Sequence, residues 1–213
     1  DSAYGIAIDA RVDTRFKSRK RYYSATAEAA ILMREYSSQP LAVFFPSYSY
    51  AEIVASYLEA DRPDFRVVSQ PRGLDLEDQA SFLEDALATS DVLLLVMGSG
   101  FAESVDLLGG RVSHAMVVGP ALPEVNAEQK ARMEDLSHLP RETAFRQVYQ
   151  APGMVKINQA LGRLVRAPGQ RAHILLHCRR FAENSYRELL DKDYRDAPVL
   201  KNTESLINWL DST

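Results

Sequence analysis

A short stretch late in the chain, INQALGRLVRAPGQR at residues 157–171, carries polar side chains that repeat at helical spacing. An α-helix has about 3.6 residues per turn, so such positions gather within one quadrant of a predicted helix. The positions are Lys156, Gln159, Arg163 and Arg166, opposite the apolar Met154, Ile157, Leu161, Leu164 and Val165. The planar, permanently charged fork of arginine suits phosphate oxygens. An amphipathic helix also needs a solvated polar face, so the spacing alone leaves a phosphate-binding row and a water-facing row as alternatives.

Hydroxyl groups follow another apolar run. PSYSY, residues 46–50, comes directly after LAVFF. Exposed amides at a helix start can bind phosphate, and Tyr48 can stack on a base or sugar. Ser49 and Glu52 also have capping-box spacing, which is a purely structural alternative.

Two carboxylates follow the run LLLVM. In GSGFAESVD, residues 98–106, Glu103 and Asp106 lie about one helical turn apart. Carboxylates at this spacing can orient a metal-bound water, a ribose or an arginine, although paired glycines more often mark a tight turn. The sequence contains no GxxxxGK[ST] loop, so a phosphate-cradling loop with its lysine is excluded.

Short apolar runs alternate with helical patterns along the chain, which predicts a parallel sheet covered by helices on both faces. The predicted strands are Gly5–Asp9, Leu41–Phe45, Arg66–Ser69, Val92–Met97, Ala115–Val118 and His173–Cys178. The predicted helices are Ala25–Glu35, Tyr50–Glu59, Leu76–Ala88, Arg141–Tyr149, Gly153–Arg166 and Thr203–Leu210, with one more in an insertion from Pro120 to Pro140. Because ligands of such sheets lie beyond the carboxyl ends of the strands, we expect the polar groups after each strand to share one edge.

The composition excludes several classes of protein. The net charge of −4 argues against a general nucleic-acid coat, while basic residues concentrate in TRFKSRKR at residues 14–21 and again between residues 141 and 195. These two segments can form a local phosphate-binding surface or two solvated faces. The single cysteine, Cys178, excludes an internal disulfide and is expected to be an inert core thiol.

No apolar run is long enough to span a bilayer and no signal sequence opens the chain, so we expect a cytoplasmic protein without a membrane partner. The four histidines, His114, His138, His173 and His177, have no metal-ligand spacing and are expected to be core or surface residues; no metal site is predicted. The chain begins at Asp1 without a methionine, which we interpret as an excised fragment.

Taken in order, four segments resemble the second motor domain of superfamily 2 DNA helicases of the DinG/XPD type. LAVFFPSYSY is similar to motif IV, and QPRGLDLEDQASFLEDAL to the glutamine and acidic helix that follow it. VMGSGFAESVDLLGGRVSHAMVVGPALP is similar to motif V, and YQAPGMVKINQALGRLVRAPGQRAHILLHCRRF to motif VI. The resemblance extends from about Val12 to Leu190 and implies a three-layer α/β/α RecA-like, P-loop NTPase-like domain over residues 1–213.

The resemblance also assigns roles to residues. Arg163 and Arg166 match the arginines that reach ATP across a cleft between two motor domains, with Gln159 and Gly162 beside them. Glu103 and Asp106 match acidic positions at the nucleotide cleft. The positions implied to contact DNA are Ser47, Tyr48, Ser99 and Gln70.

The implied protein is an ATP-dependent DNA helicase that moves 5′ to 3′ on single-stranded DNA. ATP and Mg²⁺ are held mainly by a first motor domain, whose Walker motifs are absent here, so this chain alone is expected to be inactive. An iron–sulfur cluster is implied only for that other half. Ser104, Gln170 and Cys178 depart from the family pattern, which favours the alternative of a degenerate, non-enzymatic module that binds nucleic acid or protein.

Overall fold

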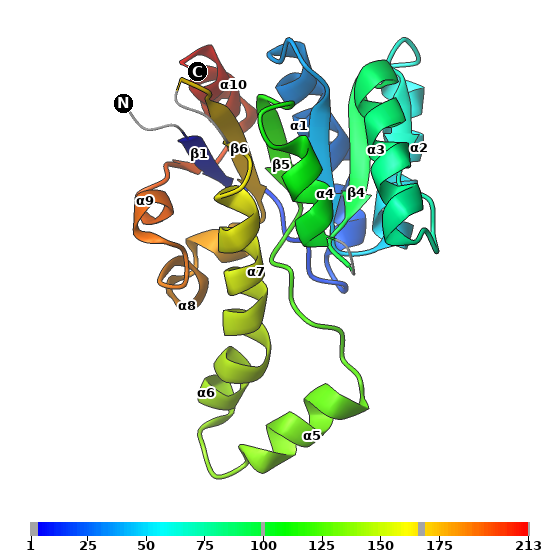
Figure 1. Cartoon of the computed structure of the whole chain (residues 1–213). Coiled ribbons are helices and arrows are strands. Elements are labelled where there is room, and N and C mark those ends of the chain that lie inside the picture. The colour runs from blue at the N-terminus through cyan, green and yellow to red at the C-terminus, as the bar shows by residue number, and fades with distance from the viewer. Residues whose placement is uncertain (1–3, 99–100, 166–168, 213) are drawn as a thin grey trace.

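The chain folds around one sheet, in which every pairing between neighbouring strands is parallel (Figure 1). The computed structural model describes residues 4–98, 101–165 and 169–212. The strands are β1 Tyr4–Asp9, β2 Leu41–Phe45, β3 Val67–Ser69, β4 Val92–Val96, β5 His114–Val117, β6 Ala172–His177 and β7 Val199–Leu200. They lie in the order β3-β4-β2-β5-β6-β1-β7. Six of the strands match the predicted runs, and β7 was not predicted because two residues carry no periodic signal.

Helices cover both faces of this sheet. The α-helices are α1 Tyr23–Glu35, α2 Tyr48–Asp61, α3 Leu76–Thr89, α4 Phe101–Leu108, α5 Ala127–Asp135, α6 Arg141–Phe145, α7 Ala151–Leu161, α8 Asn184–Arg187, α9 Lys192–Arg195 and α10 Thr203–Asp211. Three short turns of other helix types are η1 Arg19–Tyr22, η2 Arg146–Gln150 and η3 Arg179–Ala182. The predicted three-layer α/β/α fold is therefore confirmed.

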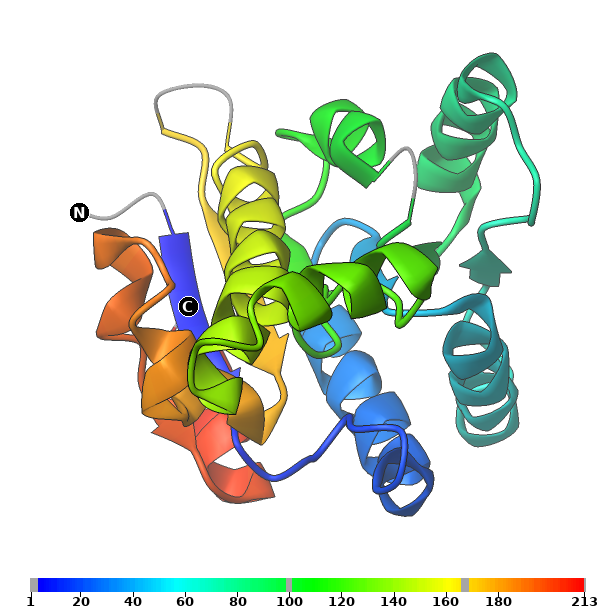
Figure 2. The ribbon, with the colours of Figure 1, turned by 90° about the horizontal axis from the view of Figure 1, so that it is seen from below.

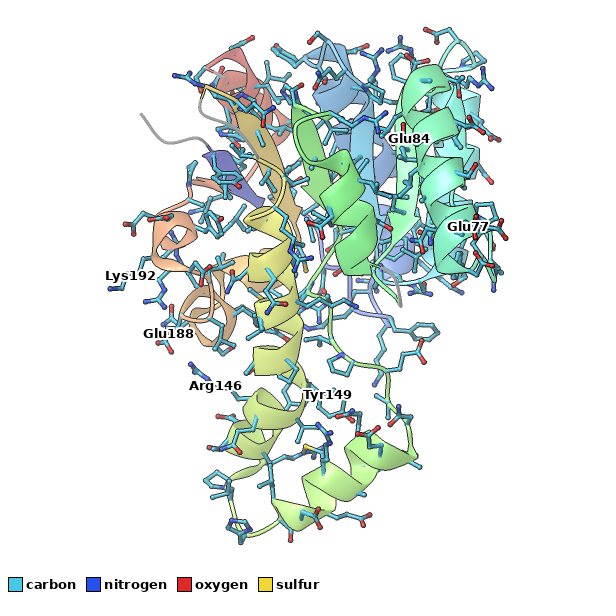
Figure 3. All side chains as sticks on the ribbon, viewed as in Figure 1. Glu77, Glu84, Arg146, Tyr149, Glu188 and Lys192 are labelled. Carbon is cyan, nitrogen blue, oxygen red and sulfur yellow. The ribbon has the colours of Figure 1, made fainter. Side chains whose placement is uncertain are left out.

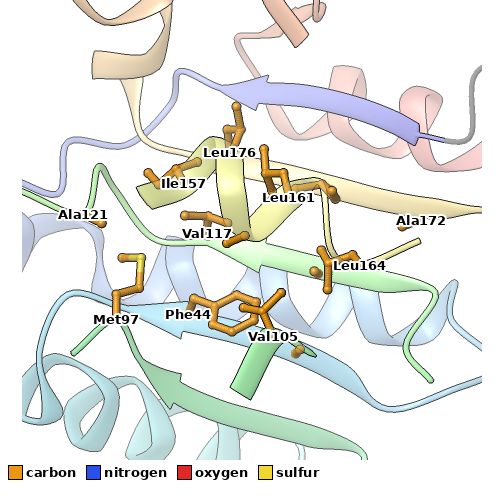
Figure 4. Packing of buried hydrophobic residues seen from close by; sticks show 14 of the residues in the cluster. Phe44, Met97, Val105, Val117, Ala121, Ile157, Leu161, Leu164, Ala172 and Leu176 are labelled. Atoms are coloured by element: carbon orange, nitrogen blue, oxygen red, sulfur yellow. The ribbon is translucent and has the colours of Figure 1, made fainter. Parts of the chain in front are cut away.

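Two apolar clusters, one on each side of the sheet, hold the layers together. One joins the sheet to α3, α4 and α7, with Phe44, Val105, Val117 and Leu161 near its centre (Figure 4). The other joins the sheet to α1, α2 and α10. All five residues of β2 and of β4 are buried, because both faces of these strands are covered. This double coverage explains why their sequences are continuous apolar runs rather than alternating ones.

The two helices predicted at Arg141–Tyr149 and Gly153–Arg166 form one continuous helical rod of α6, η2 and α7. The turn η2 is π-helical, and the N–H of Ala151 bonds to the carbonyl of Arg146, five residues earlier. Pro152 follows at the start of α7 and cannot donate a backbone bond, so the wider turn accommodates the proline without ending the rod. The rod ends at Leu161, earlier than predicted, and Gly162 is its C-cap.

Helices α5 and α6 project beyond the carboxyl ends of the strands as an arm (Figure 1), and α5 crosses below the sheet (Figure 2). Helix α5 is the one helix predicted in the insertion, and Asn126 caps its first turn. Arg146 at the base of the arm forms an ion pair with Glu188, at 3.1 Å between Nη1 and Oε2 (Figure 3). Helices α4, α8 and α9 were not predicted, since each is too short to show a clear period.

Gly5 gives a stability prediction. It pairs with His173 across β1 and β6, and a Cβ atom at Gly5 would lie 2.6 Å from Nδ1 of His173. The His173 ring packs against His114, with 4.9 Å between ring centroids, so it has little room to retreat. We expect Gly5→Ala to lower the free energy of unfolding by about 1–3 kcal/mol, as overpacking does. Urea unfolding of Gly5→Ala, alone and together with His173→Ser, measures this; an equal loss in both backgrounds would exclude the clash as the cause.

Candidate functional site

Helix α7 runs from the carboxyl ends of the strands, the carboxyl edge of the sheet, to their amino ends, the amino edge. At its start, Gly153 packs so closely on Ala121, beyond the carboxyl end of β5, that an added Cβ would lie 2.8 Å from the Ala121 carbonyl oxygen. Just after its end, the carbonyl of Leu164 accepts a bond from Gly110, ahead of β5, and the N–H of Val165 donates to the Tyr4 hydroxyl at the start of β1. The polar row of α7 therefore extends from the carboxyl edge to the amino edge of the sheet.

Lys156 occupies the carboxyl-edge end of this row. Its Nζ donates to the carbonyls of Met97, at 2.9 Å, and Gly98, at 3.1 Å, directly after β4. Burial lowers the pKa of this ammonium. The lysine thus joins α7 to the loop that begins the motif V segment.

Arg163 lies at the other end of the row, beyond the helix rather than on it. Gly162 and Arg163 sit in a tight turn, where the N–H of Arg163 bonds to the carbonyl of Ala160. The guanidinium still faces α4, and its Nη1 lies 3.0 Å from Oδ2 of Asp106. The two side chains are 42% and 44% exposed, so the pair contributes little to stability and remains accessible to a ligand.

Gln159 and Gly162 are exposed beside this pair, and we call Gln159, Gly162, Arg163 and Asp106 the arginine surface. The structure adds Asp106 of α4 to this group through its ion pair with Arg163, while Gln159 and Gly162 lie within four residues of Arg163 in the chain. Arg166 lies outside the described residues, and the side chain of Glu103 is likewise outside the described part of α4.

A second site, the carboxyl-edge groove, is an open groove of about 750 Å³. Its polar lining includes Ser47, Tyr48, Arg72 and Lys156. The Arg72 guanidinium carbon lies 5.0 Å from the centre of the half-buried Tyr48 ring. The groove combines hydroxyl, aromatic and cationic groups, a combination that suits a nucleic-acid strand.

The capping box expected between Ser49 and Glu52 does not form, which corrects that alternative. Ser47, not Ser49, is the N-cap of α2, and its Oγ accepts from the N–H of Tyr50 at 3.4 Å. Glu52 does not complete a capping box there; its Oε1 pairs with Arg72 at 2.7 Å. The same arginine therefore contacts both Glu52 and the ring of Tyr48.

Gln70, which was also predicted to contact DNA, is buried rather than exposed in the groove. Gln70 is only 8% exposed, and its side-chain oxygen accepts from the N–H of Val96 at 3.0 Å. This bond joins the chain after β3 to the end of β4, so the structure does not open Gln70 to the groove. Ser99 lies outside the described residues.

The polar groups that directly follow the strands meet at the carboxyl edge, as expected: Ser47 and Tyr48 after β2 line one groove, and Arg180 after β6 lines the groove beside it. Asp106, farther along α4, lies instead with Arg163 near the amino ends of β1 and β5. Lys156 was recognised as part of the row but not as a groove residue, because its contacts with Met97 and Gly98 join segments far apart in sequence.

The departures from the family pattern are accommodated by local contacts. The buried Ser104 accepts a hydrogen bond from Nε2 of Gln79 on α3. Cys178 is fully buried, as predicted, and its sulfur accepts from the Thr14 hydroxyl at 3.2 Å. Gln170 packs over Gly110, where an added Cβ would lie 2.6 Å from Nε2 of the glutamine. None of these three residues lines the carboxyl-edge groove.

Two predicted core histidines are buried. His177 is fully buried against Asp9, and the pKa of His114 is lowered to about 4 by burial and by the neighbouring His173. Within the described residues, no cluster of three or more His, Cys, Asp or Glu side chains could hold a metal ion. None of the helices described is both long enough and apolar enough to cross a membrane.

A sequence profile described as the helicase C-terminal domain matches residues 31–197. No curated protein sequence matches the chain. A solved apo XPD structure has a TM-score of 0.73 at 20% identity, covering 92% of this chain and 40% of that one. Xpd4 from S. tokodaii has a TM-score of 0.66 at 18% identity, covering 94% of this chain and 39% of that one.

The C-terminal domain of S. cerevisiae Dbp5, solved with Gle1 and IP6, has a TM-score of 0.59 at 11% identity, covering 99% of this chain and 98% of that one. At these identities the solved structures establish a shared fold. The chain spans well under half the length of the XPD structures.

Proposed function

The chain belongs to the helicase C-terminal domain family, and we propose that it is the second motor domain of an ATP-dependent helicase that moves 5′ to 3′ on single-stranded DNA. The observation that supports this most is the course of α7. Its polar row begins in the carboxyl-edge groove at Lys156 and leads to the arginine surface at Arg163. Lys156 and Arg163 lie seven positions apart in the chain. Helix α7 covers the first five of these steps, about 7.5 Å of helix rise, and the turn at Gly162 completes the connection between the two sites.

At the arginine surface, Arg163 and Gln159 would contact ATP held mainly by a first motor domain. ATP supplies the phosphoryl group, and Mg²⁺ neutralises charge as that group transfers. The donor set fits a polyphosphate, because Arg163 with its guanidinium and Gln159 with its carboxamide are both exposed and lie four residues apart in the chain. Before ATP binds, Asp106 holds the Arg163 side chain toward α4. Because the phosphate ligands come from two domains, hydrolysis would require their closure.

In the carboxyl-edge groove, Ser47 and Tyr48 would contact a DNA strand. The helix start supplies backbone amides for a phosphate, and the Tyr48 ring supplies a stacking surface. Lys156 would transmit a change in this groove, because its ammonium bonds the carbonyls after β4 while its backbone belongs to α7. A strand that displaced Met97 or Gly98 would therefore act on the helix that leads to Arg163.

We expect this chain to bind single-stranded DNA weakly and with a strong dependence on salt. The net charge of −4 leaves only local basic surfaces to attract phosphates. Each phosphate neutralised on a single strand contributes a slope of about −0.7 to log K against log salt. Tyr48→Ala is expected to weaken binding about fivefold or more, since one stacked base is lost.

Fluorescence anisotropy with a labelled oligothymidylate, at several salt concentrations, measures both effects. Tyr57→Ala is the matched control, because Tyr57 is an exposed tyrosine farther along the same helix. Binding that does not change with salt, or that Tyr48→Ala leaves intact, would contradict the assigned groove.

A further inference from the structure

The loop after β1, together with η1, carries a concentrated positive charge that the proposed function leaves unused. Residues 15–21, RFKSRKR, contain five cations and no anion, in a chain whose net charge is −4. We call these residues the basic loop. They precede residues 31–197, the part that matches the family profile. In the view from below, the blue segment that contains this loop runs from β1 to α1 at the carboxyl side of the sheet (Figure 2).

Phe16 is the most exposed of the large apolar side chains that the structure describes, at 79%. The guanidinium carbon of Arg19 lies 4.7 Å from the centre of the Phe16 ring and 5.1 Å from the centre of the Tyr50 ring. Arg19 thus connects Phe16 to the buried Tyr50 of α2, and most of the Phe16 surface remains open to solvent. An open ring beside a planar cation is a stacking surface for a nucleobase.

Phe16 lies beside the carboxyl-edge groove. Phe16, Arg19 and Arg180 line a groove of about 470 Å³. Pro46 and Leu122 line this groove and also the one that contains Tyr48, so the two grooves adjoin. Each therefore has an aromatic ring close to a guanidinium: Tyr48 with Arg72, and Phe16 with Arg19.

The base of the basic loop is fixed in place. The Thr14 hydroxyl accepts from Nη2 of Arg180 at 3.0 Å. Gly119 approaches so closely that an added Cβ would lie 2.3 Å from this hydroxyl. Arg15 pairs with Glu183 at 2.7 Å, and also with Asp13. These contacts position Phe16 in advance, which reduces the entropy that a ligand would lose in ordering it.

We propose that Phe16 is a second base-stacking position, and that the basic loop binds the phosphates beside it, so that a single-stranded nucleic acid continues from the carboxyl-edge groove across this loop. This inference rests on the proposed function. A single strand fits better than a duplex, because its unpaired bases can lie flat on Phe16 and Tyr48. The exposed Lys17, Lys20 and Arg21 supply the accompanying charge.

The test is binding of labelled oligothymidylates of about 4 to 16 nucleotides, the range of site sizes known for stacking grooves. Phe16→Ala is expected to weaken binding of the longer oligonucleotides by about 5- to 150-fold. Binding of the shortest oligonucleotides, which the carboxyl-edge groove alone can hold, should be unaffected. Phe16→Trp should retain full binding and Phe16→Leu should not, because only the former keeps an aromatic face. Lys17→Gln should weaken binding of the longer oligonucleotides and reduce the salt slope by about 0.7.

The outcomes separate this inference from the proposed function. If Tyr48→Ala weakens binding and Phe16→Ala matches the wild type at every length, the second stacking position is wrong and the proposed function stands. If the wild-type chain binds no oligonucleotide at low salt, both are wrong. Polyglutamate is the probe for an acidic protein partner. If it competes with the oligonucleotide for the wild-type chain, and this competition is lost equally in Phe16→Ala and Lys17→Gln, the loop binds an acidic protein and the inference is overturned. Tyr57→Ala controls for loss of an exposed ring, and unchanged melting temperatures confirm that each variant is folded.

Discussion

Replacing Arg163 by alanine in a protein that carries both motor domains should slow ATP turnover by about three orders of magnitude, the effect typical of an arginine that contacts a transferring phosphoryl group. ATP affinity should fall much less, because such a contact strengthens mainly in the transition state. Arg163→Lys should not restore turnover, since an ammonium lacks the planar fork. The melting temperature should be nearly unchanged, because the pair with Asp106 is exposed. Steady-state ATPase assays and thermal unfolding of the same preparations measure these effects.

The matched control for Arg163 is Arg111→Ala. Arg111 also forms an exposed ion pair, with Glu84 of α3, so its removal changes charge and surface in the same way. Turnover should stay near the wild-type rate in this variant. Arg166, which lies outside the described residues, is predicted to behave like Arg163. Normal turnover in both Arg163→Ala and Arg166→Ala would favour the degenerate binding module over an active motor.

Replacing Asp9 by alanine should lower the free energy of unfolding by about 3–5 kcal/mol, the cost of leaving buried charged groups without their partner. Asp9 and His177 are both fully buried, and Oδ2 of Asp9 accepts from Nδ1 of His177 at 2.8 Å. The Arg11 guanidinium lies 2.9 Å from the same oxygen. Urea unfolding of Asp9→Ala and Asp9→Asn measures the loss. Glu128→Ala, which removes an exposed pair with Arg132, is the control and should change the free energy by about 0.5 kcal/mol or less.

The same carboxylate predicts a dependence of stability on pH. Burial alone would raise the pKa of Asp9, but the charge and hydrogen bonds of His177 and Arg11 outweigh it and hold the pKa well below its usual range. A lowered folded-state pKa stabilises the protein above the unfolded value, about 3.9 for aspartate, and this contribution is lost as the pH falls below it. The difference in unfolding free energy between wild type and Asp9→Asn should therefore be largest near neutral pH and shrink in acid. A difference that grew as the pH fell would contradict this assignment.

The sheet could be predicted from the sequence because its signals are local. LAVFF and DVLLLVM are continuous apolar runs, and only strands covered on both faces require such runs. The rod of α6, η2 and α7 was predicted as two helices, because Pro152 normally ends a helix, and a π-turn that tolerates it leaves no local signal. Helix α4 and strand β7 were missed because two turns of helix and two residues of strand are stabilised mainly by what they pack on.

The sequence by itself determined which residue types are available to the proposed function: an arginine row, hydroxyls with a tyrosine after one strand, and a basic loop. Only the tertiary structure decided where they lie. It paired Arg163 with Asp106, bonded Lys156 to the carbonyls after β4, and used the side-chain oxygen of Gln70 within the fold. It also separated the row into two sites, because a helix that connects parallel strands must return from the carboxyl edge of the sheet to its amino edge. Side chains along α7 therefore cannot all reach the edge where Ser47 and Tyr48 lie, and that constraint comes from the topology of the sheet rather than from any local spacing.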